Sequence, residues 1–166
     1  MAALLKEGYK TQQAESRAIV KEFEAIAEPE SAKEKLNQQG LRALVVEDNL
    51  INQRLISILL QEYDMKVSTA SDGEEGVRKC ENQEFDIVFM DIDMPVKNGI
   101  IATQEIKERL RMKKHPMPII ALTALAMEGD RENILQEGLD DYLAKPLTRA
   151  KLEYILEKHL QVAIAQ

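Results

Sequence analysis

The sequence predicts an α/β fold in which helices cover both faces of a parallel sheet. Short apolar runs alternate with amphipathic helical stretches from Leu41 onward, and three of these runs are apolar almost throughout. Strands that are covered on both faces have this continuous apolar character, and a strand–helix alternation produces a parallel sheet. Because crossovers are right-handed, few topologies remain. We therefore expect a flavodoxin-like (βα)5 doubly wound sheet with strand order 2-1-3-4-5.

Five segments are expected to form strands, each followed by a helix. The strands are residues 43–46, 66–70, 87–90, 118–122 and 141–144. After the first strand, four apolar residues share one helical face: Ile51, Leu55, Ile58 and Leu59. The same spacing recurs near the end of the chain, at Leu152, Ile155, Leu156 and Leu160. The last two helices should cover roughly residues 127–137 and 149–161.

Residues 1–39 differ from the rest of the chain, since they contain no strand-like run and are rich in good helix formers. A narrow stripe of mostly apolar residues from Leu5 to Ile26 follows helical spacing and predicts a helix. Pro29 should end that helix, and Ser31 with Glu34 forms the pattern of a capping box that begins a second one. Three interpretations stay open: a linker or added helix, a coiled coil that forms a homodimer, or the tail of a signalling helix. We expect a helical extension over 1–39, a domain over 40–162 and a tail over 163–166.

Composition limits the function classes. The 166 residues carry 22 Lys and Arg against 29 Asp and Glu, a net charge of −7, which argues against direct nucleic-acid binding. No apolar stretch reaches the roughly 20 residues of a membrane span, and no signal peptide is recognisable at the start. Cys80 is the single cysteine, which excludes an internal disulfide and fits a reducing compartment. We therefore expect a cytoplasmic protein without membrane contact.

Chemistry-bearing residues follow four of the expected strands. In a doubly wound sheet, function gathers at the carboxyl ends of the strands, near the topological switch point. The residues at those ends are Glu47, Asp48, Asp91, Asp93, Thr123 and Lys145. Any one of them is weak evidence, because an acid after a strand is often only a helix cap. Together they predict one acidic rim with a hydroxyl and a lysine.

This combination suits phosphoryl chemistry. Crowded carboxylates repel one another, so the rim needs a proton or a hard cation, and Mg²⁺ prefers carboxylates, waters and phosphate oxygens. Lys145 would neutralise one phosphoryl oxygen, and the Thr123 hydroxyl would donate to another. One carboxylate is then able to attack phosphorus and form an aspartyl phosphate.

At this point the sequence resembles a known family, the receiver domain of two-component response regulators and hybrid histidine kinases. Four segments carry the resemblance: LVVEDN at 44–49, MDIDMPVKNG at 90–99, IALTA at 120–124 and DYLAKPL at 141–147. It implies that Asp91 accepts a phosphoryl group from the phosphohistidine of a histidine kinase or histidine phosphotransfer protein. It also implies a downstream protein target.

The resemblance assigns a role to each residue of the rim. Asp48 and Asp91 would bind Mg²⁺, with Glu47 acting near the ion and the backbone carbonyl of Asp93 as a further ligand. Thr123 and Lys145 would hold the phosphoryl oxygens, and the Lys145–Pro146 bond is commonly cis. Tyr142 occupies the position of the family's switch aromatic, which would turn inward with Thr123 and change the surface of strands 4 and 5. Asp93 departs from the pattern, because that position is more often neutral or Glu.

Two other function classes share part of the pattern. Residues 91–93 also resemble the nucleophile motif of haloacid-dehalogenase-type phosphatases, but those proteins place this motif on the opening strand, whereas here the acid pair comes first. A pseudo-receiver used only for docking is disfavoured because Asp48, Asp91, Thr123 and Lys145 are all retained. We expect self-phosphorylation with slow autodephosphorylation and no kinase catalytic domain. Whether the segment is part of a hybrid kinase or a single-domain regulator stays open.

Overall fold

The computed structural model describes residues 40–112, 117–124 and 130–164, with side chains up to Leu160. Five parallel strands form one sheet in the order β2-β1-β3-β4-β5, as predicted. The strands are β1 (Arg42–Val46), β2 (Lys66–Ala70), β3 (Ile87–Asp91), β4 (Ile119–Thr123) and β5 (Asp141–Ala144). The helices are α3 (Leu50–Gln61), α4 (Gly73–Asn82), α5 (Gly99–Leu110), α6 (Asp130–Gln136) and α7 (Arg149–Ile164).

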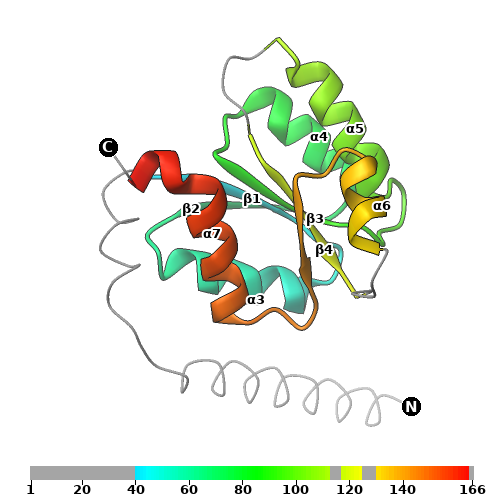
Figure 1. Cartoon of the computed structure of the whole chain (residues 1–166). Coiled ribbons are helices and arrows are strands. Elements are labelled where there is room, and N and C mark those ends of the chain that lie inside the picture. Colours follow the sequence, from blue (N-terminus) through cyan, green and yellow to red (C-terminus); the bar gives the residue numbers. More distant parts are fainter. Residues whose placement is uncertain (1–39, 113–116, 125–129, 165–166) are drawn as a thin grey trace, which may run out of the picture. The chain divides into compact units, whose positions relative to one another are not determined.

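Helices cover both faces of the sheet: α3 and α7 lie on one face, and α4, α5 and α6 on the other (Figure 1). Strands β3 and β4 are buried along their whole length, as is β1 after Arg42, which explains their nearly unbroken apolar sequences. No helix in the described ranges is long and apolar enough to cross a membrane. The helical extension and the coiled-coil interpretation predicted for residues 1–39 fall outside the described residues.

Three helices that follow strands, α3, α4 and α5, are each capped by a short polar side chain. Asn49 accepts hydrogen bonds from the backbone N–H groups of Ile51 and Asn52 at the start of α3. Asp72 and Asn98 cap α4 and α5 in the same way. Such caps satisfy N–H groups that have no partner within the helix. They place the beginnings of these helices at the edge of the sheet where the strands end.

Glycine allows α5 to start against the end of β3. A Cβ atom on Gly99 would lie 2.1 Å from the carbonyl oxygen of Asp91, so no larger residue fits there. The backbone N–H of Gly99 donates to the carbonyl of Ile92 at 3.0 Å, which closes the loop between them. The last residue of β3 is therefore held rigidly at the carboxyl edge of the sheet.

Candidate functional site

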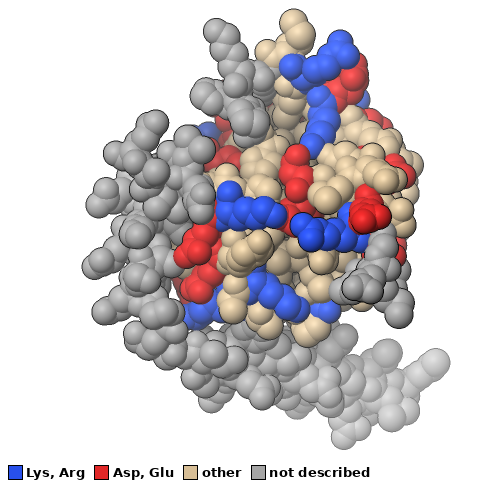
Figure 2. Space-filling view, viewed as in Figure 1, with Lys and Arg blue, Asp and Glu red and all other residues tan. Residues whose placement is uncertain are grey.

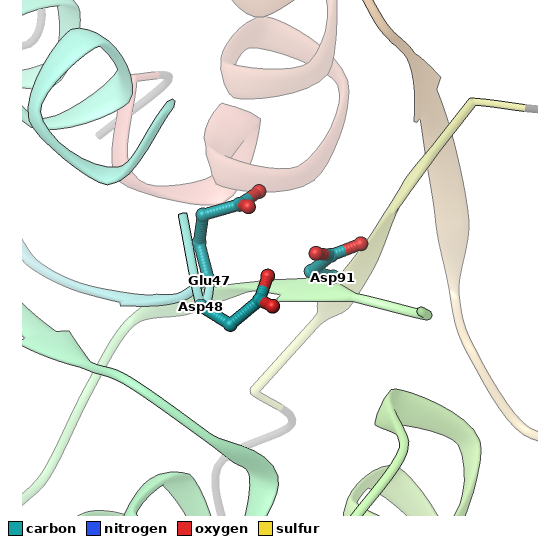
Figure 3. Close-up of side chains that lie close together, drawn as sticks. All are labelled: Glu47, Asp48 and Asp91. Carbon is teal, nitrogen blue, oxygen red and sulfur yellow. The ribbon is translucent and has the colours of Figure 1, made fainter. Parts of the chain in front are cut away.

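Three carboxylates meet at the carboxyl edge of the sheet (Figure 3). One oxygen from each of Glu47, Asp48 and Asp91 lies within 4.8 Å of the others. Glu47 and Asp48 follow β1, and Asp91 is the last residue of β3, its neighbour in the sheet. Glu47 and Asp91 are buried, with exposed fractions of 1% and 4%, whereas Asp48 is exposed. We call these three residues the acidic cluster.

Lys145 places a positive charge beside the acidic cluster. Its Nζ lies 2.9 Å from Glu47 Oε2 and 3.2 Å from Asp91 Oδ1. The lysine is held at this edge because its backbone N–H donates to the carbonyl of Thr123 at 2.8 Å, which ties the end of β4 to the segment after β5. The Lys145–Pro146 peptide bond is cis, as the resemblance implied.

The ionisation of Asp91 reflects this crowded environment. Burial, and then the charge of Glu47, raise the pKa of Asp91 to about 6, against the opposing effects of Lys145 and of the Asp93 backbone N–H. Burial alone would lower the pKa of Lys145, but its contacts with Glu47 and Asp91 raise it. Since three acids face one ammonium, the cluster retains excess negative charge. Oxygen-only donors with uncompensated charge fit a hard divalent cation such as Mg²⁺.

The first turn of α3 holds the acidic cluster from one side. Glu47 Oε1 accepts from the backbone N–H of Asn49 at 3.2 Å and from Asn52 Nδ2 at 3.4 Å. Gln53 Nε2 lies 3.1 Å from the backbone carbonyl oxygens of both Glu47 and Ala70. Sequence reasoning missed Asn52 and Gln53, because amide side chains in the first turns of helices are common and carry no distinctive signal.

Two predicted site residues lie beside the acidic cluster rather than in it. The backbone N–H of Asp93 donates to Asp91 Oδ1 at 3.3 Å, but the exposed Asp93 side chain is not one of the three clustered carboxylates. Thr123 is buried as the last residue of β4, the strand next to β3. The structure thus brings Glu47, Asp48, Asp91 and Lys145 into direct proximity and places Thr123 at the same edge.

Tyr142 lies elsewhere, on the edge strand β5. It is half-buried against the core and lines a groove of about 520 Å³ between α6, β5 and α7. Three cationic side chains line this groove, namely Arg131, Lys151 and Lys158. Figure 2, viewed as in Figure 1, shows Lys and Arg side chains in the middle of the face turned toward the viewer. We call this groove the β5 groove.

Asp141, at the start of β5, is a buried acid that the sequence reasoning missed. Its Oδ2 lies 2.6 Å from Lys158 Nζ and 3.0 Å from His159 Nε2. Burial alone would raise the pKa of Asp141, but Lys158 and His159 lower it overall. The only available signal was an acid that directly precedes the apolar residues of an expected strand. These contacts fasten α7 to β5.

The fold and the acidic cluster define a class: α/β domains with a cation-binding acidic site at the carboxyl edge of a parallel sheet. Residues 43–157 match the family model of the response regulator receiver domain. The chain belongs to this family and contains a receiver domain of the two-component phosphorelay type.

Similar proteins support the same family. The sensor histidine kinase GacS of Pseudomonas protegens is 36% identical over 142 residues, which cover 84% of this chain and 15% of that kinase. This chain spans between 4% and 15% of the length of the first four curated relatives that it matches, which are two hybrid signal transduction histidine kinases, a sensor histidine kinase and a sensor protein.

Two solved structures are informative. The receiver domain of the sensor histidine kinase PA1611 from Pseudomonas aeruginosa, crystallised with a magnesium ion in its active-site cleft, is 44% identical with a TM-score of 0.66, over 74% of this chain and 98% of that one. The receiver domain of Ssk1 from Saccharomyces cerevisiae, in complex with the histidine phosphotransfer protein Ypd1, matches with a TM-score of 0.68 and 30% identity, over 74% of this chain and 91% of that one. Receiver domains thus interact with histidine phosphotransfer proteins.

Proposed function

We propose that this receiver domain accepts a phosphoryl group on Asp91 in a Mg²⁺-dependent reaction, with a phosphohistidine as donor. The observation that carries this proposal is the acidic cluster, in which Asp91 lies beside two further acids and the Lys145 ammonium. In the described residues, both contacts of the Asp91 carboxylate fall on Oδ1. The other oxygen, Oδ2, is therefore the natural nucleophile.

The magnesium site would be formed by Asp48 and Asp91, with Glu47 acting near the ion and the Asp93 backbone carbonyl as a further ligand. A magnesium ion bound there supplies positive charge that offsets the carboxylates and the phosphoryl oxygens. The fit rests on the donor set, which is made only of oxygens and carries more negative charge than Lys145 balances. The magnesium-bound receiver of PA1611 supports the choice of ion.

In the transfer step, an Asp91 oxygen forms a bond to phosphorus while the bond between phosphorus and the donor imidazole nitrogen breaks. The electron pair of that bond stays on the imidazole, whose other ring nitrogen already carries a proton, so the donor leaves as neutral imidazole. Lys145 and the Thr123 hydroxyl hold the phosphoryl oxygens in the trigonal arrangement of the transition state. Hydrolysis of the aspartyl phosphate by water would return Asp91 slowly to its free form.

Phosphorylation would then be read at the β5 groove. A phosphoryl group adds about −1.5 to −2 charge and strong acceptors, which would draw Thr123 inward and allow Tyr142 to follow. Tyr142 is half-buried and already packs on the core, so a small rotation would alter the groove that a downstream protein contacts. Shifting the ratio of the two conformations from 1:99 to 99:1 needs about 5.5 kcal/mol of differential stabilisation by the phosphoryl group.

The donor would be a histidine kinase or a histidine phosphotransfer protein, as the Ypd1 complex of the related yeast receiver suggests. The kinase relatives favour a hybrid sensor histidine kinase as the wider context, with a single-domain response regulator as the alternative. The boundaries at residues 40 and 162, a homodimer through residues 1–39 and a cytoplasmic location remain part of this proposal.

Labelling with acetyl phosphate and Mg²⁺ tests the proposal and separates it from its alternatives. Intact-mass spectrometry should show a single, slowly lost phosphoryl group on the wild type and on the control Asp64→Asn, which removes an exposed acid distant in sequence from the site. Asp91→Ala should show none. Repeated turnover of acetyl phosphate would indicate an aspartate-nucleophile phosphatase, and no adduct on the wild type would indicate a pseudo-receiver.

A further inference from the structure

The side-chain amide of Gln53 bridges the ends of two strands. Its Nε2 lies 3.1 Å from the carbonyl oxygen of Glu47, just after β1, and 3.1 Å from the carbonyl oxygen of Ala70, the last residue of β2. Both neighbours are acceptors only, so the amide nitrogen, with its two N–H donors, must face them rather than the amide oxygen. One side chain on α3 therefore satisfies two carbonyls at the carboxyl edge of the sheet.

The Glu47 carbonyl needs such a donor because β1 leaves the sheet at this point. The pairing of β1 with β2 ends at Val46 and Ala70, and the backbone N–H of Glu47 makes the next hydrogen bond, to Ala70 at 3.0 Å. The Glu47 carbonyl belongs to the peptide group that joins Glu47 to Asp48. A donor on it fixes the plane of this peptide and hence the direction in which the Asp48 side chain leaves the backbone.

Asp48 differs from the other two carboxylates in how it is held. Glu47 and Asp91 are buried and each contacts Lys145. Asp48 is exposed, and its carboxylate takes part in no hydrogen bond or ion pair with any residue that the structure describes. Its contribution to the acidic cluster therefore depends on the backbone that carries it.

We propose that Gln53 is a positioning residue for the divalent cation: by fixing the peptide between Glu47 and Asp48, it aims the Asp48 carboxylate into the acidic cluster. This inference rests on the Mg²⁺ site of the proposed function. Partners that orient metal ligands typically change metal affinity about 10- to 100-fold when they are removed. Because Gln53 acts on a backbone carbonyl and not on the ion, we expect the lower end, about 10-fold.

Gln53→Met is the test variant, since it keeps a straight chain of similar length and removes both donors. Gln61→Met, at the exposed end of the same helix, is the matched control. Isothermal titration of the metal-free proteins with Mg²⁺ should give about 10-fold weaker binding for Gln53→Met and unchanged binding for Gln61→Met. Acetyl phosphate labelling of Gln53→Met should require more Mg²⁺ but reach the wild-type rate at saturation.

A double-mutant cycle with Asp48→Asn separates positioning from a general structural role. If Gln53 acts through Asp48, adding Gln53→Met to Asp48→Asn produces little further loss of Mg²⁺ affinity. An equal loss in both backgrounds, or unchanged affinity in Gln53→Met alone, overturns the inference. If Gln53→Met does not fold, Gln53→Asn, whose amide is one methylene too short to reach both carbonyls, serves in the same cycle with the same criteria.

These outcomes are distinguishable from a failure of the proposed function. If the wild type is not labelled with a phosphoryl group but still binds Mg²⁺, the phosphoacceptor role is refuted. The double-mutant cycle of Mg²⁺ affinities still tests the positioning role of Gln53. Unchanged Mg²⁺ affinity in Gln53→Met, with normal labelling of the wild type, refutes only the positioning role. Absence of Mg²⁺ binding by the wild type overturns both.

Discussion

Asp91→Asn is expected to make the metal-free protein more stable while abolishing phosphorylation. Burial and the charge of Glu47 raise the pKa of Asp91 from 3.8 to about 6. At 1.36 kcal/mol for each pKa unit, the ionised form of this buried side chain costs the folded state about 3 kcal/mol. The Asn side chain carries no charge but still loses hydration on burial, so we expect a gain of about 1–3 kcal/mol.

The pH dependence of this gain has a definite sign. The pKa of Asp91 is raised in the folded protein, so between about pH 4 and pH 6 the folded state binds more protons than the unfolded state. The free energy of unfolding of the wild type therefore falls as the pH rises through this window, and the full cost is present above pH 6. The advantage of Asp91→Asn should be largest at pH 8 and should shrink towards pH 4.

Urea unfolding in EDTA at pH 8, 6 and 4.5 measures this difference, with Glu84→Gln as a control because Glu84 is exposed and outside the acidic cluster. Adding Mg²⁺ should stabilise the wild type more than Asp91→Asn, since the variant lacks one of the three carboxylates. Equal or lower stability of Asp91→Asn at pH 8 in EDTA would refute the reasoning, because the cluster would then hold no uncompensated charge.

Three further predictions concern the same edge of the sheet. Mg²⁺ affinity measured by calorimetry should fall up to about tenfold per pH unit below pH 6, because protons compete for Asp91, whose pKa is raised to about 6; a flat profile from pH 7 to 5 contradicts this. Asp93→Asn removes an exposed charge near the cluster, so Mg²⁺ binding should weaken by up to about fivefold or the aspartyl-phosphate lifetime should change; equal affinity and equal hydrolysis rates remove the idea. Gly99→Ala places a Cβ 2.1 Å from the Asp91 carbonyl oxygen and should cost more than about 3 kcal/mol in urea unfolding. In contrast, Gly40→Ala, with φ of 60° and open space, should cost only about 1 kcal/mol.

The fold was predictable because the strand segments can be recognised from their own residues. The expected strands at 43–46 and 87–90 each gain one residue in the structure, and the expected strand at 118–122 is shifted by one, to Ile119–Thr123. A continuous apolar run indicates a buried strand wherever it lies in the sheet, so no knowledge of neighbours was needed. Helix ends were less well defined, since α7 continues to Ile164 and not to 161.

The main acids of the site were predictable from the sequence, but the side-chain contacts that hold the surrounding segments in place were not. Glu47, Asp48 and Asp91 were found because parallel strands bring their carboxyl ends to one edge, so position in the sequence alone places these acids near one another. The contacts of Gln53 with two carbonyls, and of Asp141 with Lys158 and His159, depend on how helices pack on the sheet. Such side-chain contacts between distant segments leave no periodic trace in the sequence.

The excess charge of the acidic cluster connects stability with function. Glu47 and Asp91 lie buried beside one ammonium, with exposed Asp48 as the third acid, so a cation at this place stabilises the folded protein and completes the site at once. In the proposed reaction, the same excess charge means that an incoming phosphoryl group, itself anionic, would require both that cation and Lys145 before Asp91 could approach phosphorus. A cluster neutralised by further buried cations would be more stable, but it would bind neither group with useful affinity. Under the proposed function, phosphoryl transfer would therefore depend on the same uncompensated charge that destabilises the metal-free site.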